Sequence, residues 1–144
     1  LKSNGEYDRS LKNYYKALEI DVKVFGEVHP NVAIRYNNIG SALQSKREYG
    51  KALEDYNIAL GIDLTVFGEE HPNTARDYHN ISKLYHDTDR SMEGLPYIIK
   101  AYKIFMKFLG PVHPHTKASR LGLKMHGGDP EEIDRQLREE GFSF

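Results

Sequence analysis

A phrase of eight residues recurs in this chain at a fixed interval of 42 residues. It reads VFGEVHPN at 24–31, VFGEEHPN at 66–73 and, more loosely, FLGPVHPH at 108–115. Other apolar positions keep the same interval, as Ile20, Ile62 and Ile104 do. A repeat of this length is typical of arrays in which each copy is one supersecondary unit that buries its core by stacking on its neighbours.

Within one copy the apolar residues have helical spacing. One face is formed by Tyr49, Ala52, Leu53, Tyr56, Ala59 and Leu60, and a second by Val32, Ala33, Tyr36, Ile39 and Leu43. The two faces are joined by the short polar stretch QSKREYG, which predicts antiparallel neighbouring helices. No window alternates with a period of two, so no sheet is expected. The predicted helices lie near 6–24, 30–45, 48–66, 72–86, 90–108, 114–126 and 130–140.

The recurring phrase has two interpretations. Its histidines, His29, His71 and His113, could gather at a metal or catalytic centre, or the phrase could be the joint between repeats. Glycine after a helix and proline at the start of the next are joint signals. Equivalent residues of stacked helices lie about 10 Å apart per helix layer, whereas a histidine binds a metal ion at about 2 Å. We therefore prefer the joint, with the histidines at the N-cap side of each helix, and predict no metal site.

Composition narrows the function classes. The chain has 144 residues, a net charge of −1 and no cysteine. The balanced charge gives no reason to expect nucleic acid or a membrane surface as a partner. The absence of cysteine excludes disulfides and thiolate metal sites. A cytoplasmic location is expected. The chain begins with Leu1 inside a repeat, so it looks like a segment of a longer protein.

No catalytic constellation is visible. The serines and threonines have no paired histidine and acid, and GxGxxG, P-loop, HExxH and CxxC motifs are lacking. The acidic residues mostly have salt-bridge spacing on the outer faces of helices. We therefore expect neither an enzyme nor a cofactor.

The building block resembles a known family. REYGKALEDYNIAL at 47–60 and AIRYNNIGSAL at 33–43 resemble tetratricopeptide repeats, and the 42-residue period with the joint phrase resembles the kinesin-light-chain type. The resemblance covers about residues 5–126 and implies an all-α, right-handed α-solenoid of antiparallel helix pairs. The expected organisation is an array over 1–126, with a partial repeat at 1–24 and repeats from about 30, 72 and 114, followed by an acidic capping helix and tail at 127–144.

The resemblance also implies where a ligand lies, because the YNNIG stretch of the first helix of a repeat faces the concave groove. An asparagine amide can pair with the backbone of a peptide, although Asn38 and Asn80 could instead bridge neighbouring helices. The predicted peptide-binding residues are Asn37, Asn38, Ser41, Arg76, His79, Asn80 and Lys83. The second half of this set is basic to neutral, which favours an acidic partner peptide.

The C-terminal segment has a distinct charge. Residues 129–144 hold six acids against two arginines, a net −4, while residues 89–127 carry a net +5. Asp129 as N-cap, Pro130 and Glu132 predict a helix that starts with a capping box. Phe142 and Phe144 have no place in the 42-residue register. They are either a frayed end or an acidic–aromatic segment that mimics a ligand and gives weak self-association.

Taken together, the sequence predicts a non-catalytic scaffold or adaptor that binds peptide segments of a partner protein. A motor–cargo adaptor like kinesin light chain is one specific form of it. The alternative is a regulatory or self-association arm of a larger multidomain enzyme or signalling protein. A flanking coiled coil would favour the first, and a flanking catalytic domain the second.

Overall fold

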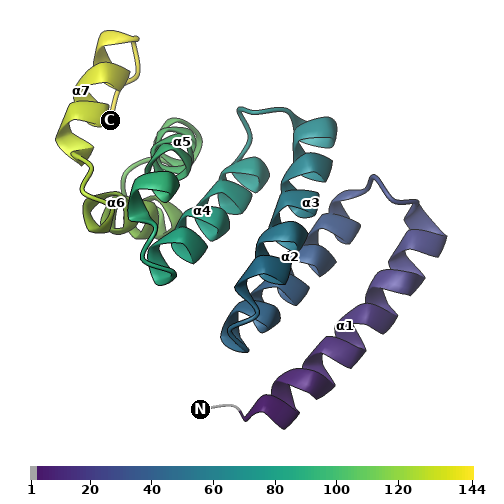
Figure 1. The fold of residues 1–144 in the computed structure, drawn as a ribbon. Coiled ribbons are helices and arrows are strands. Elements are labelled where there is room, and N and C mark those ends of the chain that lie inside the picture. Colours follow the sequence, from purple (N-terminus) through teal and green to yellow (C-terminus); the bar gives the residue numbers. More distant parts are fainter. Residues whose placement is uncertain (1–2) are drawn as a thin grey trace. The chain divides into compact units, whose positions relative to one another are not determined.

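A computed structural model describes residues 3–144, and within this range all regular structure is helical (Figure 1). The helices are α1 (Asn4–Phe25), α2 (Pro30–Ser45), α3 (Tyr49–Phe67), α4 (Pro72–Asp87), α5 (Ser91–Leu109), α6 (Pro114–Met125) and α7 (Pro130–Glu139). The predicted all-α fold is confirmed, and each helix begins and ends within two residues of its predicted bounds.

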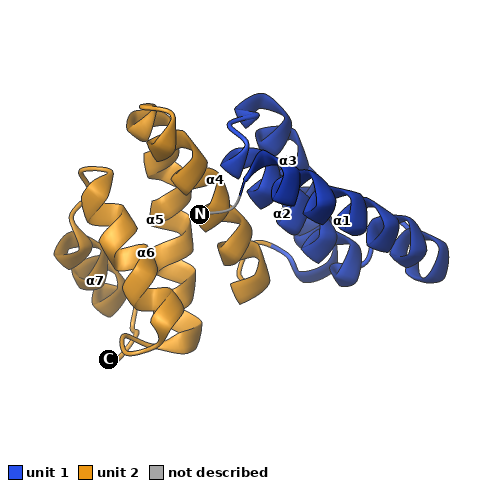
Figure 2. Cartoon of the chain, turned by 90° about the horizontal axis from the view of Figure 1, so that it is seen from below, with its two compact units in different colours: residues 1–68 blue, residues 69–144 orange. Residues whose placement is uncertain are grey.

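The chain forms two compact units (Figure 2). Unit 1 is Leu1–Gly68 and contains α1 to α3, while unit 2 is Glu69–Phe144 and contains α4 to α7. In unit 1, α2 packs against both α1 and α3. In unit 2, α5 packs against α4, α6 and α7. Helices that follow one another in sequence therefore pack as pairs, as a tetratricopeptide array requires.

The recurring phrase forms the joints between helices. The Nδ1 atoms of His29, His71 and His113 accept a hydrogen bond from the backbone N–H two residues later, at 3.1, 3.0 and 3.1 Å. Each histidine is the N-cap of a helix whose first residue is proline. The preceding helices end at glycines with positive φ, such as Gly26 at 85°, a conformation that costs glycine little. The joint interpretation is confirmed.

Close helix packing in unit 1 depends on a small residue. Val32, Ala33, Ala59 and Ile62 form a buried cluster between α2 and α3, joined by Leu18 and Val22 of α1. Further along α2, a Cβ atom at Gly40 would lie 2.7 Å from the Tyr56 ring. A larger residue there would overpack the α2–α3 pair.

A polar network attaches α7. The Tyr102 hydroxyl donates to Asp134 Oδ1 at 2.6 Å, and Arg120 donates to Asp134 Oδ2 at 2.9 Å and to Tyr102 at 2.6 Å. Burial, together with the hydrogen bond to Asp134, raises the pKa of Tyr102. The buried side chains of Ile133 and Leu137 complete the contact. The network ties α5, α6 and α7 together.

The predicted capping box of α7 is wrong in one part. Asp129 is the N-cap and accepts from the Glu131 N–H at 3.1 Å. The Glu132 carboxylate, however, accepts from Arg135 and Gln136, one helical turn further on. A nearby arginine is a stronger donor than the backbone N–H of the N-cap residue, so Glu132 turns along the helix.

Two negative findings apply to residues 3–144. No helix in this range combines the length and apolar character needed to cross a membrane. No group of three or more histidine, aspartate or glutamate side chains in it is arranged to hold a metal ion.

Candidate functional site

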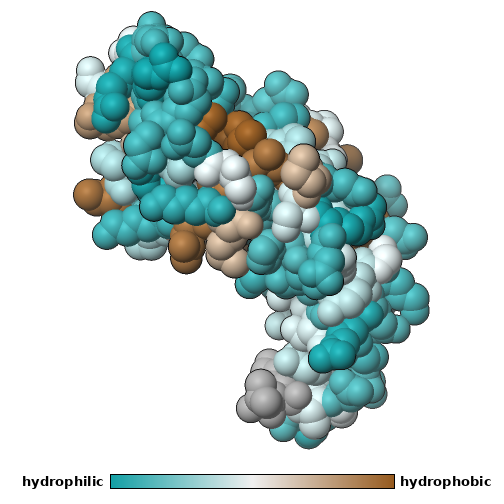
Figure 3. Space-filling view, turned by 60° about the vertical axis from the view of Figure 1, so that its left-hand side comes forward, coloured by the Kyte–Doolittle hydropathy of each residue, from teal (hydrophilic) through white to brown (hydrophobic). Residues whose placement is uncertain are grey.

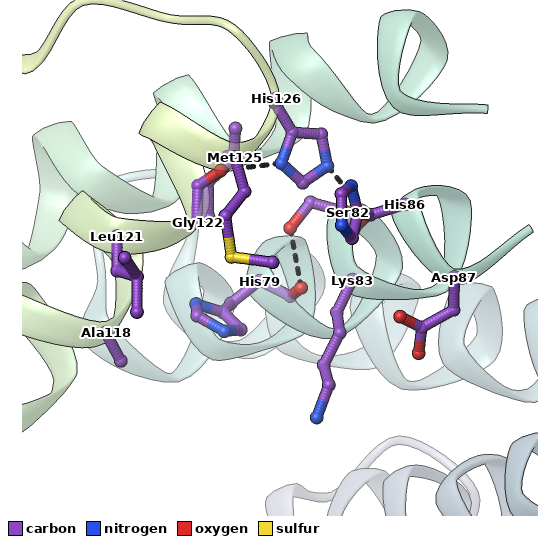
Figure 4. A pocket seen from close by; sticks show the side chains of 11 residues that line it. His79, Ser82, Lys83, His86, Asp87, Ala118, Leu121, Gly122, Met125 and His126 are labelled. Carbon is purple, nitrogen blue, oxygen red and sulfur yellow. Dashed lines mark hydrogen bonds between the residues drawn. The ribbon is translucent and has the colours of Figure 1, made fainter. Parts of the chain in front are cut away.

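Unit 2 has a pocket between α4, α5 and α6, with a volume of about 170 Å³ (Figure 4). We call it the α4–α6 pocket. It is lined by His79, Ser82, Lys83, His86, Asp87, Ile98, Ala118, Leu121, Gly122, Met125 and His126. The polar members come mainly from α4 and the apolar ones from α5 and α6, so the pocket has two chemically different walls.

The apolar wall is open to solvent. Leu121 is 60% exposed and Met125 is 52% exposed, one helical turn apart on α6. Hydrophobic side chains come to the surface in the part of the molecule that carries the C-terminal helices (Figure 3). Exposed apolar side chains that adjoin a concave, partly polar site are a feature of binding surfaces.

The polar wall carries a cation and a neutral histidine. Lys83 is exposed and makes no ion pair with any residue in the range 3–144. Burial, with smaller contributions from Lys83, His115 and His126, lowers the pKa of His79 to about 4. At neutral pH, His79 is therefore an uncharged hydrogen-bonding group. Asp87 at the rim contributes a negative charge.

His126 holds α6 against α4 at the base of the pocket. Its Nδ1 atom lies 2.7 Å from the Gly122 carbonyl oxygen and its Nε2 atom 3.0 Å from the Ser82 carbonyl oxygen. Gly94 of α5 leaves room for this ring, because a Cβ atom there would lie 2.8 Å from His126 Nε2. The pocket therefore depends on an imidazole and a glycine that fit each other.

Unit 1 has its own pocket, of about 410 Å³, between α1 and α2. We call it the α1–α2 pocket. It is lined by Tyr7, Ser10, Tyr14, Asn38, Ser41, Ala42 and Ser45. All of these side chains are uncharged, and most can donate and accept hydrogen bonds.

The predicted site residues fall into two groups, one in each unit. Asn38 and Ser41 line the α1–α2 pocket, and His79 and Lys83 line the α4–α6 pocket. The other three line neither of these two pockets: Asn37 is 8% exposed, Asn80 is half-buried, and Arg76 is half-buried with an Nε atom that has no hydrogen-bond partner.

Sequence reasoning missed the apolar wall. Leu121 and Met125 stand at the positions of His79 and Lys83 one repeat earlier, but the predicted set of site residues ends at Lys83, in the second copy. The departures of the third copy from the pattern were the available signal, because apolar residues replace polar ones at positions 121 and 125. At the next position the exchange is reversed, because His126 replaces Leu84.

The aromatic tail lies on its own unit, outside the α4–α6 pocket. Lys107 of α5 lies over the Phe142 ring at 5.3 Å, and Arg138 of α7 lies over the Phe144 ring at 5.0 Å. Phe144 also lines a cavity of about 220 Å³ with Tyr102 and Met106. Cation–π contacts of this kind stabilise the tail by about 0.5–1 kcal/mol each at exposed sites.

Comparison with known families identifies the chain. The sequence model of the tetratricopeptide repeat matches residues 1–63 and 36–91. The chain belongs to the tetratricopeptide repeat family, whose domains are generally protein-interaction modules and typically non-catalytic. A comparison with curated protein sequences finds no match.

Solved structures show the same fold. Kinesin light chain nearly identical TPR-like repeats from Podosopora anserina match with a TM-score of 0.67 at 19% identity, over 94% of this chain and 66% of theirs. BtubC (BKLC) from P. vanneervenii matches with a TM-score of 0.71 at 20% identity, over 97% of this chain and 60% of its own. This chain spans 60–66% of the length of these structures. At identities this low, the structural matches establish similarity of fold and nothing further.

Proposed function

We propose that this protein is a non-catalytic scaffold or adaptor that binds peptide segments of a partner protein, with the α4–α6 pocket of unit 2 as a main contact. The observation that carries the proposal is the exposed apolar wall of Leu121 and Met125 beside the exposed cation Lys83. An apolar surface with few polar groups around it binds a ligand that matches both. Membership of a family of protein-interaction modules supports the same function.

The charges favour an acidic peptide that carries an apolar or aromatic residue. Because the pKa of His79 is about 4, the attraction for carboxylates at neutral pH rests on Lys83 and Arg76. His79 then donates or accepts a hydrogen bond. Asn38 and Ser41 in unit 1 and the half-buried Asn80 in unit 2 belong to the same proposal as partners for a peptide backbone, whereas Asn37 is largely buried. Nucleic acid and membranes are not proposed as partners.

Charge reversal tests the proposal. In a fluorescence-anisotropy titration with an acidic peptide that contains one aromatic residue, Lys83→Glu should weaken binding roughly fivefold to thirtyfold, equivalent to about 1–2 kcal/mol, and should reduce its salt dependence. Arg76→Glu should act in the same direction. The matched control is Lys12→Glu, which makes the same change of net charge at an exposed lysine of α1. Equal weakening by Lys83→Glu and Lys12→Glu would show non-specific attraction and contradict the proposal.

Within this function we infer a cytoplasmic adaptor. The neighbours described as kinesin light chain repeats make a motor–cargo adaptor the particular form to test first. A regulatory arm of a larger multidomain protein is the alternative. Co-purification with a motor subunit would support the first form, and a catalytic domain in the same polypeptide would support the second.

A further inference from the structure

The chain contains three methionines, and their exposure to solvent differs widely. Met92, near the start of α5, is 80% exposed, and Met125, the last residue of α6, is 52% exposed. Met106, near the end of α5, is only 4% exposed. Access to solvent decides which thioether a dissolved oxidant reaches first. Met92 and Met125 are therefore open to oxidation, and Met106 is protected.

Met125 differs from Met92 in what surrounds it. Met125 lines the α4–α6 pocket, whereas Met92 lines neither this pocket nor the α1–α2 pocket. Figure 4 shows the Met125 side chain reaching into the pocket, toward the α4 wall that carries His79 and Lys83. A change of polarity at the Met125 sulfur is therefore a change in the pocket itself.

A methionine at this position is particular to the third copy of the repeat. In the 42-residue register the same position holds Ser41 in the first copy and Lys83 in the second. Neither of these side chains carries a sulfur that a peroxide could oxidise, and no methionine lines the α1–α2 pocket. The two pockets therefore differ in how they respond to an oxidant.

Oxidation of a thioether by a peroxide is a two-electron step that balances without any other reactant. With hydrogen peroxide, a sulfur lone pair attacks one oxygen, an S–O bond forms and the O–O bond breaks. The sulfur is oxidised by two electrons, and the second oxygen takes the proton of the transferred oxygen and leaves as water. The product, methionine sulfoxide, is polar and chiral, whereas the thioether is apolar and flexible.

In the α4–α6 pocket the sulfoxide has two effects on binding. It interrupts the exposed apolar wall that Leu121 and Met125 share. Its oxygen is also a hydrogen-bond acceptor, and Lys83, which makes no ion pair within residues 3–144, offers a donor in the same pocket. An acceptor supplied by the protein competes with a carboxylate of the ligand for this ammonium group.

We propose that Met125 is a reversible oxidation site that switches the α4–α6 pocket between a binding form, with the thioether, and a weakly binding form, with the sulfoxide. The modifying reagent is a peroxide, and a methionine sulfoxide reductase reverses the step. The proposal rests on the peptide-binding function proposed above for this pocket. Met92, which is more exposed but lies outside the pocket, is oxidised without effect on binding.

Graded oxidation of the whole chain with hydrogen peroxide tests the proposal. Peptide mass spectrometry should find Met92 and Met125 oxidised at a dose that leaves Met106 intact. At this dose, fluorescence anisotropy with the acidic, aromatic-containing peptide should show binding weakened at least about threefold, because an apolar contact is lost. Treatment with methionine sulfoxide reductases should restore the affinity.

Two leucine variants separate the methionines, since leucine has a similar volume and no sulfur. Met92→Leu should bind as the untreated protein does and should still lose affinity on oxidation. Met125→Leu, whatever its starting affinity, should change its affinity less than about 1.5-fold on the same treatment.

The outcomes distinguish this proposal from the function on which it rests. It is overturned if oxidation of Met125 leaves the affinity of the wild type unchanged, if Met125→Leu loses as much affinity as the wild type, or if Met106 is oxidised before Met125. Absence of binding by the untreated protein would contradict the proposed function, and this proposal with it.

Discussion

α1 and α5 stand at the same position in two copies of one repeat, but their surroundings differ. α5 is covered on one side by α4 and on others by α6 and α7, whereas α1 packs chiefly against α2 and reaches the cluster between α2 and α3 through Leu18 and Val22. In the 42-residue register, Tyr14 corresponds to Ile98 and Ser10 corresponds to Gly94. Only the two residues of α5 are buried. Burial at a repeat position is therefore set by which neighbours are present, and residue type follows it only partly.

The difference extends to the chemistry of the two pockets. Beside α5 the inner-face positions of α6 carry Leu121 and Met125, while the same positions of α2 carry Asn37 and Ser41. The α4–α6 pocket is consequently apolar on one wall, and the α1–α2 pocket is uncharged and polar. One repeat pattern thus supports two pockets of different chemistry.

The largest expected effect comes from filling the small position of each helix. Gly94→Leu should destabilise the protein by about 1–3 kcal/mol, because the new side chain would meet His126 and the backbone of Ser82. Ser10→Leu, at the same repeat position in α1, should change the free energy of unfolding by less than about 0.5 kcal/mol. Urea denaturation measures both, and an equal loss in the two variants would break the comparison.

An effect of comparable size should come from the network that α5 has and α1 lacks. Tyr102 and Arg120 stand at the positions of Leu18 and Tyr36 and hold Asp134 of α7. Asp134→Asn should cost about 1.5–3 kcal/mol, because it weakens two hydrogen bonds, one of them to a charged donor. The control Glu132→Gln removes an exposed ion pair within α7 and should cost at most about 1 kcal/mol. Thermal unfolding compares them.

Acid should affect the stability of the two units differently. His79 has a pKa of about 4 in the folded protein against 6.5 unfolded, so the unfolded state binds a proton first as the pH falls. Stability from the neutral ring is present above pH 6.5 and is lost between 6.5 and about 4. Asn37 stands at this position in unit 1, which makes His79→Asn the natural control. Between pH 7 and pH 5 the wild type should lose about 1–2 kcal/mol more stability than this variant. Parallel losses would contradict the burial of His79.

Much of this fold follows from local sequence. The joints are encoded by three adjacent signals: glycine with positive φ, a histidine N-cap and proline at the first helical position, which explains the accurate helix bounds. Glu132 departs from its predicted role because Arg135 is within reach, a competition that no spacing rule resolves. Asn37 was expected to face a ligand, but it is 8% exposed, since accessibility depends on neighbouring helices.

The candidate site was predicted in part. His79 and Lys83 lie together, because residues four apart on one helix share a face. The apolar wall opposite them comes from α6, whose distance from α4 is fixed by His126 and Gly94. That fit joins residues more than thirty positions apart, so periodicity alone could not reveal it.

Mapping an acidic, aromatic-containing peptide onto the protein by NMR tests the central claim most directly. The account predicts that the largest shift changes fall on His79, Lys83, Leu121 and Met125, and that they saturate together. Lys100 and Lys103 of α5 lie outside this pocket and test for non-specific attraction. Changes that are largest at these two lysines, or an absence of change at the α4–α6 pocket, would contradict the account.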